Sequence, residues 1–273
     1  MSVEALCREV GMSRQNYYGR RRERMREQIE EKLVVELVQA ERKLQPRLGG
    51  RKLWRLVSGE LAAAGVSLGR DRFFGVLRRR GLLVERRSRG CRTTESRHGW
   101  RVYPNLVEGR ALTGPHQVWV SDITYLRTAE GFVYLALVMD AWSRKIVGYD
   151  CSGSLEAEGA RRALRQALGQ LPAGARVVHH SDRGIQYCCR EYVGLLAAAG
   201  AQVSMTQERH CYENGQAERL NGILKQEYGL GETLGSRAEA QIQVREAVAL
   251  YNERRPHAAL GYRFPAAVHE AAA

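Results

Sequence analysis

The sequence has no long apolar segment. No run approaches the ~20 residues that a helix needs to cross a bilayer, and the amino terminus lacks the apolar core of a signal peptide. We therefore expect a cytoplasmic protein without a membrane partner. Its hydrophobic content of 44% and charged content of 27% are typical of a globular chain.

Cysteine is present without a pattern. The six cysteines have no repeated spacing, so no disulfide framework is expected. Two adjacent pairs, His179-His180 and Cys188-Cys189, contain residue types that bind zinc. Zinc sites usually place a few residues between paired ligands, and neither pair does so. The sequence therefore does not predict a zinc site.

Excess positive charge is absent from the carboxyl-terminal part of the chain. The first 113 residues contain 26 Lys and Arg and 13 Asp and Glu, whereas the remaining 160 contain 17 of each. An excess confined to one part is typical of a surface that binds a polyanion, with nucleic acid as the commonest case. The alternative is a solvated basic surface that aids solubility.

The chain begins with the spacing of a helix-turn-helix over residues 3–22. Ser13 is positioned to cap the second helix. Arg14, Gln15 and Asn16 then lie at its exposed start, where such helices contact DNA bases in the major groove. The alternative is a helical hairpin that only packs.

A long helix is predicted over residues 23–44, so that residues 1–45 form one helical domain. Its apolar side chains recur at three-to-four-residue spacing. They are Ile29, Leu33, Leu37, Ala40 and Leu44. This stripe is either a core face or a short coiled-coil seam for self-association.

Residues 46–83 are predicted to form a second helix-turn-helix-like domain. Pro46 and two glycines end the preceding helix, and apolar faces lie on both sides of a turn at residues 64–66. We expect DNA contacts from three arginines of its second helix, Arg78, Arg79 and Arg80. Residues 84–113 are rich in arginine and have little periodicity, which indicates a basic linker that becomes ordered along a DNA backbone.

Residues 114–273 have the element order of a ribonuclease-H-like fold. Three strands in a meander precede alternating helices and strands, and two helices follow. The predicted strands cover residues 119–126, 132–139, 145–151, 176–180 and 202–205. The predicted helices cover residues 155–168, 190–199, 214–228 and 236–252. We therefore predict an α/β domain with a five-stranded mixed sheet flanked by helices.

Three acidic residues stand out on these elements. Asp122 is the one charged residue of an apolar, β-branched run, where a lone charge is costly unless it is paired or binds a cation. Asp182 follows a predicted strand and precedes the turn at Gly184. Glu218 lies on a predicted helix. The strand of Asp122, the strand end at Asp182 and the helix of Glu218 can bring the three carboxylates to one point.

The helix of Glu218 has a face suited to DNA phosphate. Lys225 follows Glu218 by seven residues, close to two turns, so both lie on this face. Asn214 and Asn221 share the face, whereas Glu227 points to the opposite side. A fourth carboxylate, Asp140, lies in a predicted turn, and there we expect it to accept backbone hydrogen bonds.

One spacing and three local sequences resemble a known family. Between Asp182 and Glu218 lie 35 residues, which resembles the DD(35)E signature of retroviral integrases and insertion-sequence transposases. Lys225 matches the basic residue that follows this signature. The local sequences are WVSDITY at 119–125, HSDRG with QY at 180–187, and YNERRPH at 251–257. Together they resemble the second-reading-frame (OrfB) transposases of the insertion-sequence-three family over nearly the whole chain.

The resemblance implies a bacterial, nucleoid-associated DNA transposase. Such an enzyme cleaves DNA at the ends of its mobile element and joins a 3′-hydroxyl to target DNA. Asp122, Asp182 and Glu218 would hold Mg²⁺, with Mn²⁺ as a substitute, and Lys225 and Asn221 would lie against the DNA. The first 90 residues would recognise the terminal inverted repeats. The implied partners are further copies of the chain on DNA and a helix-turn-helix protein from an upstream reading frame.

Two alternatives stay open on the residues. A hydrolytic ribonuclease-H-like nuclease would use the same carboxylates without joining strands. A non-catalytic DNA-binding regulator would use only the basic amino-terminal part. One local departure from the family is Gly50-Arg51, where many relatives have Gly-Tyr-Arg.

Overall fold

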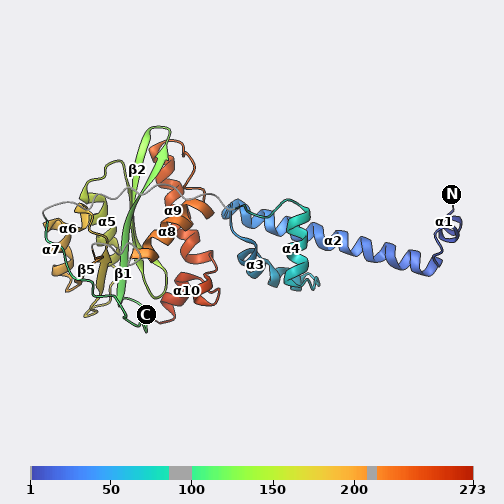
Figure 1. Ribbon diagram of the computed structural model, residues 1–273, viewed down its shortest axis with the longest axis horizontal. Helices are drawn as coiled ribbons and strands as arrows, with labels where there is room; N and C mark the ends of the chain where they lie inside the picture. Colours follow the sequence, from blue (N-terminus) through green and yellow to red (C-terminus); the bar gives the residue numbers. More distant parts are fainter. Residues whose placement is uncertain (1, 86–99, 208–213, 273) are drawn as a thin grey trace. The chain divides into compact units, whose positions relative to one another are not determined.

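The computed structural model describes residues 2–85, 100–207 and 214–272 (Figure 1). The chain divides into two compact units, which we call the amino-terminal unit (residues 1–44 with 48–85) and the carboxyl-terminal unit (residues 45–47 with 86–273). Part of the predicted basic linker, residues 86–99, lies outside the described residues. Within the described ranges, every helix is too short or too polar to cross a bilayer.

Four helices form the amino-terminal unit: α1 (Val3–Glu9), α2 (Arg14–Leu44), α3 (Gly50–Ala63) and α4 (Arg70–Arg79). The predicted cap of α2 is confirmed, because Asn16 N donates to Ser13 Oγ at 3.1 Å. The predicted boundary between residues 22 and 23 is wrong, since α2 is one helix of 31 residues. Its sequence contains no proline to interrupt the hydrogen bonds of the helix.

The core of the amino-terminal unit includes only part of the predicted stripe of α2, because Leu33 and Leu37 pack against it as partly buried residues. Val34 and Val38 are fully buried against apolar side chains of α3 and α4. By contrast, Ile29 is 68% exposed and Leu44 is 46% exposed. Apolar residues occupy adjacent faces of this helix, and packing against α3 and α4 decides which of them are fully buried. Self-association through the predicted stripe stays a prediction.

A five-stranded sheet in the order β3-β2-β1-β4-β5 organises the carboxyl-terminal unit. The strands are β1 (Val118–Thr128), β2 (Gly131–Asp140), β3 (Ile146–Ser152), β4 (Val178–Ser181) and β5 (Gln202–Met205). The first three form an antiparallel meander, whereas β4 is parallel to β1 and β5 is parallel to β4. This mixed sheet confirms the predicted ribonuclease-H-like α/β fold.

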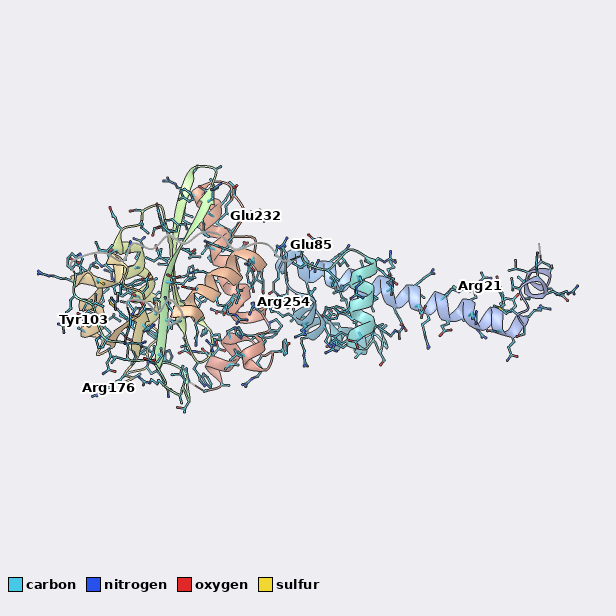
Figure 2. All side chains as sticks on the ribbon, in the orientation of Figure 1. Arg21, Glu85, Tyr103, Arg176, Glu232 and Arg254 are labelled. Carbon is cyan, nitrogen blue, oxygen red and sulfur yellow. The ribbon has the colours of Figure 1, made fainter. Side chains whose placement is uncertain are left out.

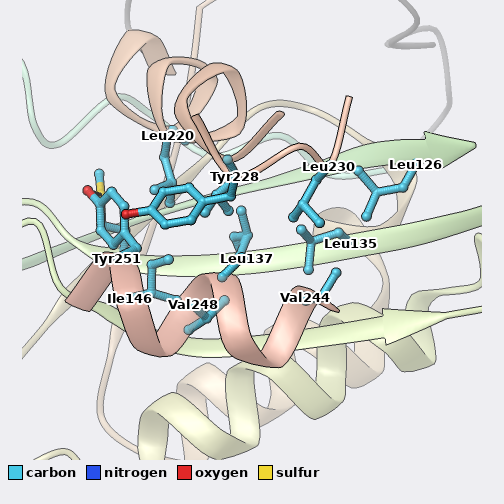
Figure 3. Close-up of a cluster of buried hydrophobic side chains, with 14 of the residues drawn as sticks. Leu126, Leu135, Leu137, Ile146, Leu220, Tyr228, Leu230, Val244, Val248 and Tyr251 are labelled. Atoms are coloured by element: carbon cyan, nitrogen blue, oxygen red, sulfur yellow. Dashed lines mark hydrogen bonds between the residues drawn. The ribbon is translucent and has the colours of Figure 1, made fainter. Parts of the chain in front are cut away.

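Helices cover both faces of the sheet (Figure 1). One face packs against α5 (Ala157–Leu168), the one-turn α6 (Ile185–Cys188) and α7 (Arg190–Ala198). The other packs against α8 (Gly215–Glu227) and α9 (Arg237–Arg254), and Figure 3 shows the apolar side chains between them and the strands. The chain then forms η2 (Ala258–Leu260) and α10 (Pro265–Glu270). The short α6 and α10 have too few residues for periodicity to predict them.

Asp140, at the end of β2, has the predicted structural role. It is fully buried, and its carboxylate accepts backbone hydrogen bonds from His116 at 2.7 Å, Trp142 at 3.2 Å and Ser143 at 2.7 Å. It therefore fixes both the turn between β2 and β3 and the segment that leads into β1.

Gly148 allows β3 to pack directly on the backbone of α5. A methyl group on this residue would overlap the carbonyl oxygen of Ala163 and lie 3.0 Å from Cβ of Ala167. Since α5 must then move away from the sheet, Gly148→Ala is expected to lower the free energy of unfolding by about 1–3 kcal/mol. Urea unfolding followed by circular dichroism measures this change.

The control is the same substitution at an open position. Among the described residues, no atom other than those of α7's own nearby backbone lies within 4 Å of a methyl group added to Gly194 of α7. Gly194→Ala is therefore expected to raise the free energy of unfolding by roughly 0.5–1 kcal/mol, because alanine loses less backbone entropy in a helix. Equal effects of the two substitutions would contradict the close packing of β3 on α5.

Candidate active site

Parallel pairing of β1 with β4 brings Asp122 and Asp182 together. Val120 pairs with His180, and each aspartate follows its residue of this pair by two positions, so Asp182, directly after the end of β4, lies beside Asp122. Neighbouring strands lie about 4.8 Å apart. The two carboxylates are close enough for the negative charge of Asp182 to raise the pKa of Asp122.

The surroundings of Asp122 disfavour its charged form. Burial is the largest cause that raises the pKa of Asp122, to about 7, and the charges of Asp182 and then Glu218 add to it. Two hydrogen bonds oppose this shift. Ile123 N donates to Oδ1 at 3.0 Å, and Asn221 Nδ2 donates to Oδ2 at 2.7 Å. Two adjacent carboxylates of this kind are both ionised at neutral pH only when a positive charge lies beside them.

Glu218 lies further from this pair. It is exposed in the first turn of α8, one turn before Asn221 and on the same face. Its charge is the weakest of the three causes that raise the pKa of Asp122. In the described part of the chain, no three His, Cys, Asp or Glu side chains are close enough to hold a metal ion together. The structure thus brings the two aspartates together and leaves Glu218 on the helix that contacts them.

The groups around Asp122 fit a hydrated, hard cation. Asn214 and Asn221 are buried, and the Oδ1 atom of each has no hydrogen-bond donor among the described residues. Asn214 is held in place because its Nδ2 donates to Ser121 O at 3.0 Å. Mg²⁺ binds carboxylate oxygens and keeps part of its water shell, and such waters donate readily to amide oxygens. This set of oxygens suits Mg²⁺ or Mn²⁺ rather than a metal that prefers sulfur and nitrogen.

Lys225, on α8, lies near enough to Asp122 for the two charges to interact. Burial lowers the pKa of Lys225, and the negative charge of Asp122 acts in the opposite direction. Glu227 points elsewhere, as predicted, because its carboxylate binds the guanidinium of Arg255 at 2.8 and 3.1 Å. Arg255 is only 4% exposed, so this ion pair fixes α8 against the end of α9.

A buried polar network behind Asp122 is absent from the sequence-based predictions. His179 Nε2 lies 2.7 Å from Ser121 Oγ and 2.9 Å from Tyr192 OH. Burial lowers the pKa of His179 to about 3, so its ring is neutral. Because Ser121 precedes Asp122, this network holds β1 in place at the carboxylate. The signal that reveals it is the register between β1 and β4, which the sequence alone does not give.

The residues predicted to contact DNA in the amino-terminal unit are all exposed: Arg14, Gln15, Asn16, Arg78, Arg79 and Arg80. Figure 2 shows further basic side chains along α2, with Arg21 labelled. Arg79 and Arg80 already have a partner, because they donate to Glu31 at 3.0 and 2.7 Å. These hydrogen bonds lower the pKa of Glu31.

Comparisons with known proteins identify relatives over nearly the whole chain. Two family models, both described as integrase core domain, match residues 113–211 and 199–265. An insertion element IS600 protein of 31 kDa from Shigella sonnei is 35% identical, and the alignment covers 97% of each chain. The transposase InsF for insertion sequence IS3A from Escherichia coli strain K12 is 33% identical, over 95% of this chain and 91% of that protein. A solved structure of the HTLV-2 integrase catalytic core domain in complex with magnesium has 16% identity, a TM-score of 0.45, and covers 57% of this chain and 97% of that one.

The pKa of Asp122 predicts how its removal changes stability. The folded-state value, about 7, lies above the ordinary value of 3.8, so ionised Asp122 destabilises the metal-free folded state above pH ~7 and not below pH ~4. Asp122→Asn should therefore stabilise the metal-free protein at neutral pH by up to ~4 kcal/mol, at ~1.4 kcal/mol per pKa unit. Asn221 now donates through Nδ2 to Asp122 at 2.7 Å, and a half-turn of its amide group presents Oδ1 as an acceptor for the new amide.

Urea unfolding of chelator-treated protein at about pH 5 and about pH 8 measures this effect. The matched control is Asp150→Asn, which weakens hydrogen bonds from Arg162 at 2.7 and 2.9 Å and should give no gain at either pH. A gain from Asp122→Asn that is equal at both pH values would contradict the electrostatic account.

Proposed function

This chain belongs to the IS3 family of insertion-sequence transposases, and we propose that Asp122, Asp182 and Glu218 are its catalytic carboxylates. The protein is a DNA transposase and a DDE-type polynucleotidyl transferase. The observation that carries the assignment is the adjacent pair Asp122 and Asp182, since burial and then the charge of Asp182 raise the pKa of Asp122. The exposed Glu218, one turn from Asn221, supplies the third carboxylate by rotation of its side chain.

The reaction is a transfer between phosphodiesters. A 3′-hydroxyl at the end of the element attacks a target phosphorus atom, a new P–O bond forms, and the bond to the target 3′-oxygen breaks. When bound, Mg²⁺ ions, or Mn²⁺ as a substitute, would activate the attacking oxygen and stabilise the leaving one. The cleavage that frees the 3′-hydroxyl uses water as the attacking group in the same site.

The residues around the carboxylates have separate roles in this proposal. Asn221 orients Asp122 through its 2.7 Å hydrogen bond to Oδ2 and lies against the DNA strand. Lys225, one turn further along α8, provides positive charge for the phosphate that reacts. His179 keeps β1 in position through Ser121, to which it lies at 2.7 Å. Since α8 and β1 are both anchored in the core, these groups meet substrate in a fixed arrangement.

We assign DNA recognition to the amino-terminal residues. Residues 1–45 and 46–83 would bind the terminal inverted repeats, residues 84–113 would follow the backbone, and residues 114–273 would act on element ends and target DNA. The charge difference between the first 113 residues and the rest supports this division. Assembly of several copies on DNA, and an upstream-frame helix-turn-helix partner, belong to the same proposal.

Strand joining tests the catalytic assignment. The substrate is a labelled duplex that carries an end of the element encoding this chain, incubated with Mg²⁺ and target DNA. Asp182→Asn and Glu218→Gln should each reduce joined product by more than ~100-fold, since loss of even an outer partner of a metal ligand costs about 10- to 100-fold. Removal of metal with a chelator should abolish joining, and Mg²⁺ or Mn²⁺ should restore it.

The matched control is Glu158→Gln, which neutralises a carboxylate in the first turn of α5, on the other face of the sheet. It should join strands at the wild-type rate. Cleavage without joining by the wild type would indicate a nuclease. DNA binding without any reaction, even after the upstream-frame protein is added, would indicate a regulator and reject the proposal.

The ion pairs of Glu31 give a second prediction, for DNA affinity. Glu31→Gln should release Arg79 and Arg80, which it binds at 3.0 and 2.7 Å. If both then contact phosphates, the plot of log affinity against log salt should steepen by up to about 1.8, at about 0.9 per phosphate. Fluorescence anisotropy with duplex DNA over a range of salt measures this slope. The control is Glu27→Gln, which removes the charge of an exposed carboxylate on the same helix. If it steepens the slope equally, the effect comes from the change in net charge and not from the release of Arg79 and Arg80.

A further inference from the structure

Arg144 holds a backbone conformation that favours glycine. It lies in the turn between β2 and β3 with φ of 65°, in the left-handed region that side chains other than glycine rarely adopt. The turn is rigid, because Arg144 N donates to Asp140 O at 2.9 Å and the carboxylate of Asp140 binds the intervening residues. A large cation is therefore kept at a position where the backbone alone would favour glycine, which directs attention to its side chain.

The guanidinium of Arg144 has no counter-ion among the described residues. It is half-buried, and its Nε atom is fully buried without a hydrogen-bond acceptor in the same part of the chain. Burial is the main cause that lowers the pKa of Arg144. Asp140 is the carboxylate whose charge acts on it, but both oxygens of Asp140 already accept hydrogen bonds from His116, Trp142 and Ser143. A partly buried cation in this state is costly unless an anion binds to it.

A second arginine is close enough to act on Arg144 electrostatically. The positive charge of Arg219 also lowers the pKa of Arg144, and both guanidiniums act on the buried hydroxyl of Tyr251. Arg219 is exposed on α8, next to Glu218, and it too lacks an ion-pair partner within the described residues. Figure 3 shows Tyr251 in one cluster with Leu220, which directly follows Arg219, and Ile146, which lies two residues after Arg144.

The third arginine near Tyr251 is different. Arg255 is neutralised by Glu227 at 2.8 and 3.1 Å, so its charge is balanced inside the protein. Arg144 and Arg219 are left as two neighbouring cations, one rigid and one exposed. Together they match an anion with several oxygens, because arginine donates in a planar fork that suits phosphate.

We propose that Arg144 and Arg219 bind one backbone phosphate of the DNA strand that passes the catalytic carboxylates. The proposal rests on the proposed function, since the adjacent Glu218 is the helical carboxylate of that site. The pair would fix the strand at a point beside the reacting phosphate, in addition to Lys225. Inorganic phosphate has the same chemistry, and the experiment separates the two sources.

The experiment measures the salt dependence of DNA binding by the full chain, with a duplex of random sequence and without divalent metal. The variants are Arg144→Gly, Arg219→Gln and the double variant. Loss of one phosphate contact flattens the slope of log affinity against log salt by about 0.9. The double variant should reach about this value, and neither single variant should exceed it. Arg245→Gln, an exposed arginine on α9, is the control that should leave the slope unchanged.

The choice of glycine keeps the test independent of folding. Because glycine adopts a positive φ without strain, Arg144→Gly should not lower the melting temperature. A lower melting temperature with an unchanged slope would assign Arg144 a structural role and overturn the proposal. The proposal is also overturned if the slope changes in Arg219→Gln but not in Arg144→Gly. A slope change of about 1.8 in the double variant would overturn it too, because that value indicates two separate phosphates.

Two further outcomes separate this inference from the others. Inorganic phosphate could raise the melting temperature of the wild type but not of the variants, while the salt slopes for DNA binding are the same in all of them. In that case the site binds a free anion and the DNA proposal fails. Strand joining is measured separately. If the slope is flattened in the double variant but the wild type does not join strands, this inference stands and the catalytic assignment is rejected. If the wild type joins strands and the slopes are unchanged in the variants, the catalytic assignment stands and this inference is rejected.

Discussion

Repulsion between two neighbouring carboxylates is the constraint on which the catalytic end of this protein depends. The parallel register of β1 and β4 brings Asp122 of β1 close to Asp182, which directly follows β4, and burial raises the pKa of Asp122 to about 7. A fold that needed only stability would not keep this arrangement, because a neutral pair of the same size would pack without the penalty. The arrangement is useful when a divalent cation and a phosphate share the site, since the cation turns repulsion between the carboxylates into binding energy.

The helix α8 connects this electrostatic site to the hydrophobic core. Asn214, Asn221 and Lys225 lie around Asp122, and Leu220 and Leu224, on the adjoining side of the helix, are buried in the core. At the end of the helix, Glu227 Oε2 forms a buried ion pair with Arg255 Nε at 2.8 Å, which fixes this end in place. Because these contacts leave α8 little freedom to rotate, Glu218 has a fixed starting point and only its own side chain must move. Pre-organisation of this kind lowers the entropy that is lost when substrate binds.

The sequence predicted the sheet and its helices well because each strand is a short apolar run between turn residues, and the face of α8 follows from helical spacing. Tertiary packing decided the parts that the sequence did not predict. On α2, contact with α3 and α4 buries Val34 and Val38 fully and the predicted Leu33 and Leu37 only partly, and it leaves the predicted Ile29 and Leu44 exposed. The network of Ser121, His179 and Tyr192 depends on strand register. The position of Glu218 depends on a side-chain rotamer, so no spacing could indicate that it lies away from the two aspartates.

The arginines of the two units illustrate how burial determines what a positive charge can do. Arg79 and Arg80 are exposed and pair with Glu31, and such surface pairs contribute little, about 0–1 kcal/mol, so DNA can replace the carboxylate at small cost. Arg255 is buried with Glu227 and cannot exchange its partner without leaving a charge unpaired in the core. Arg144 is the intermediate case, half-buried, strained in its backbone and without a counter-ion among the described residues. A cation of this kind gains most from an incoming phosphate, because binding removes a penalty that the free protein already carries.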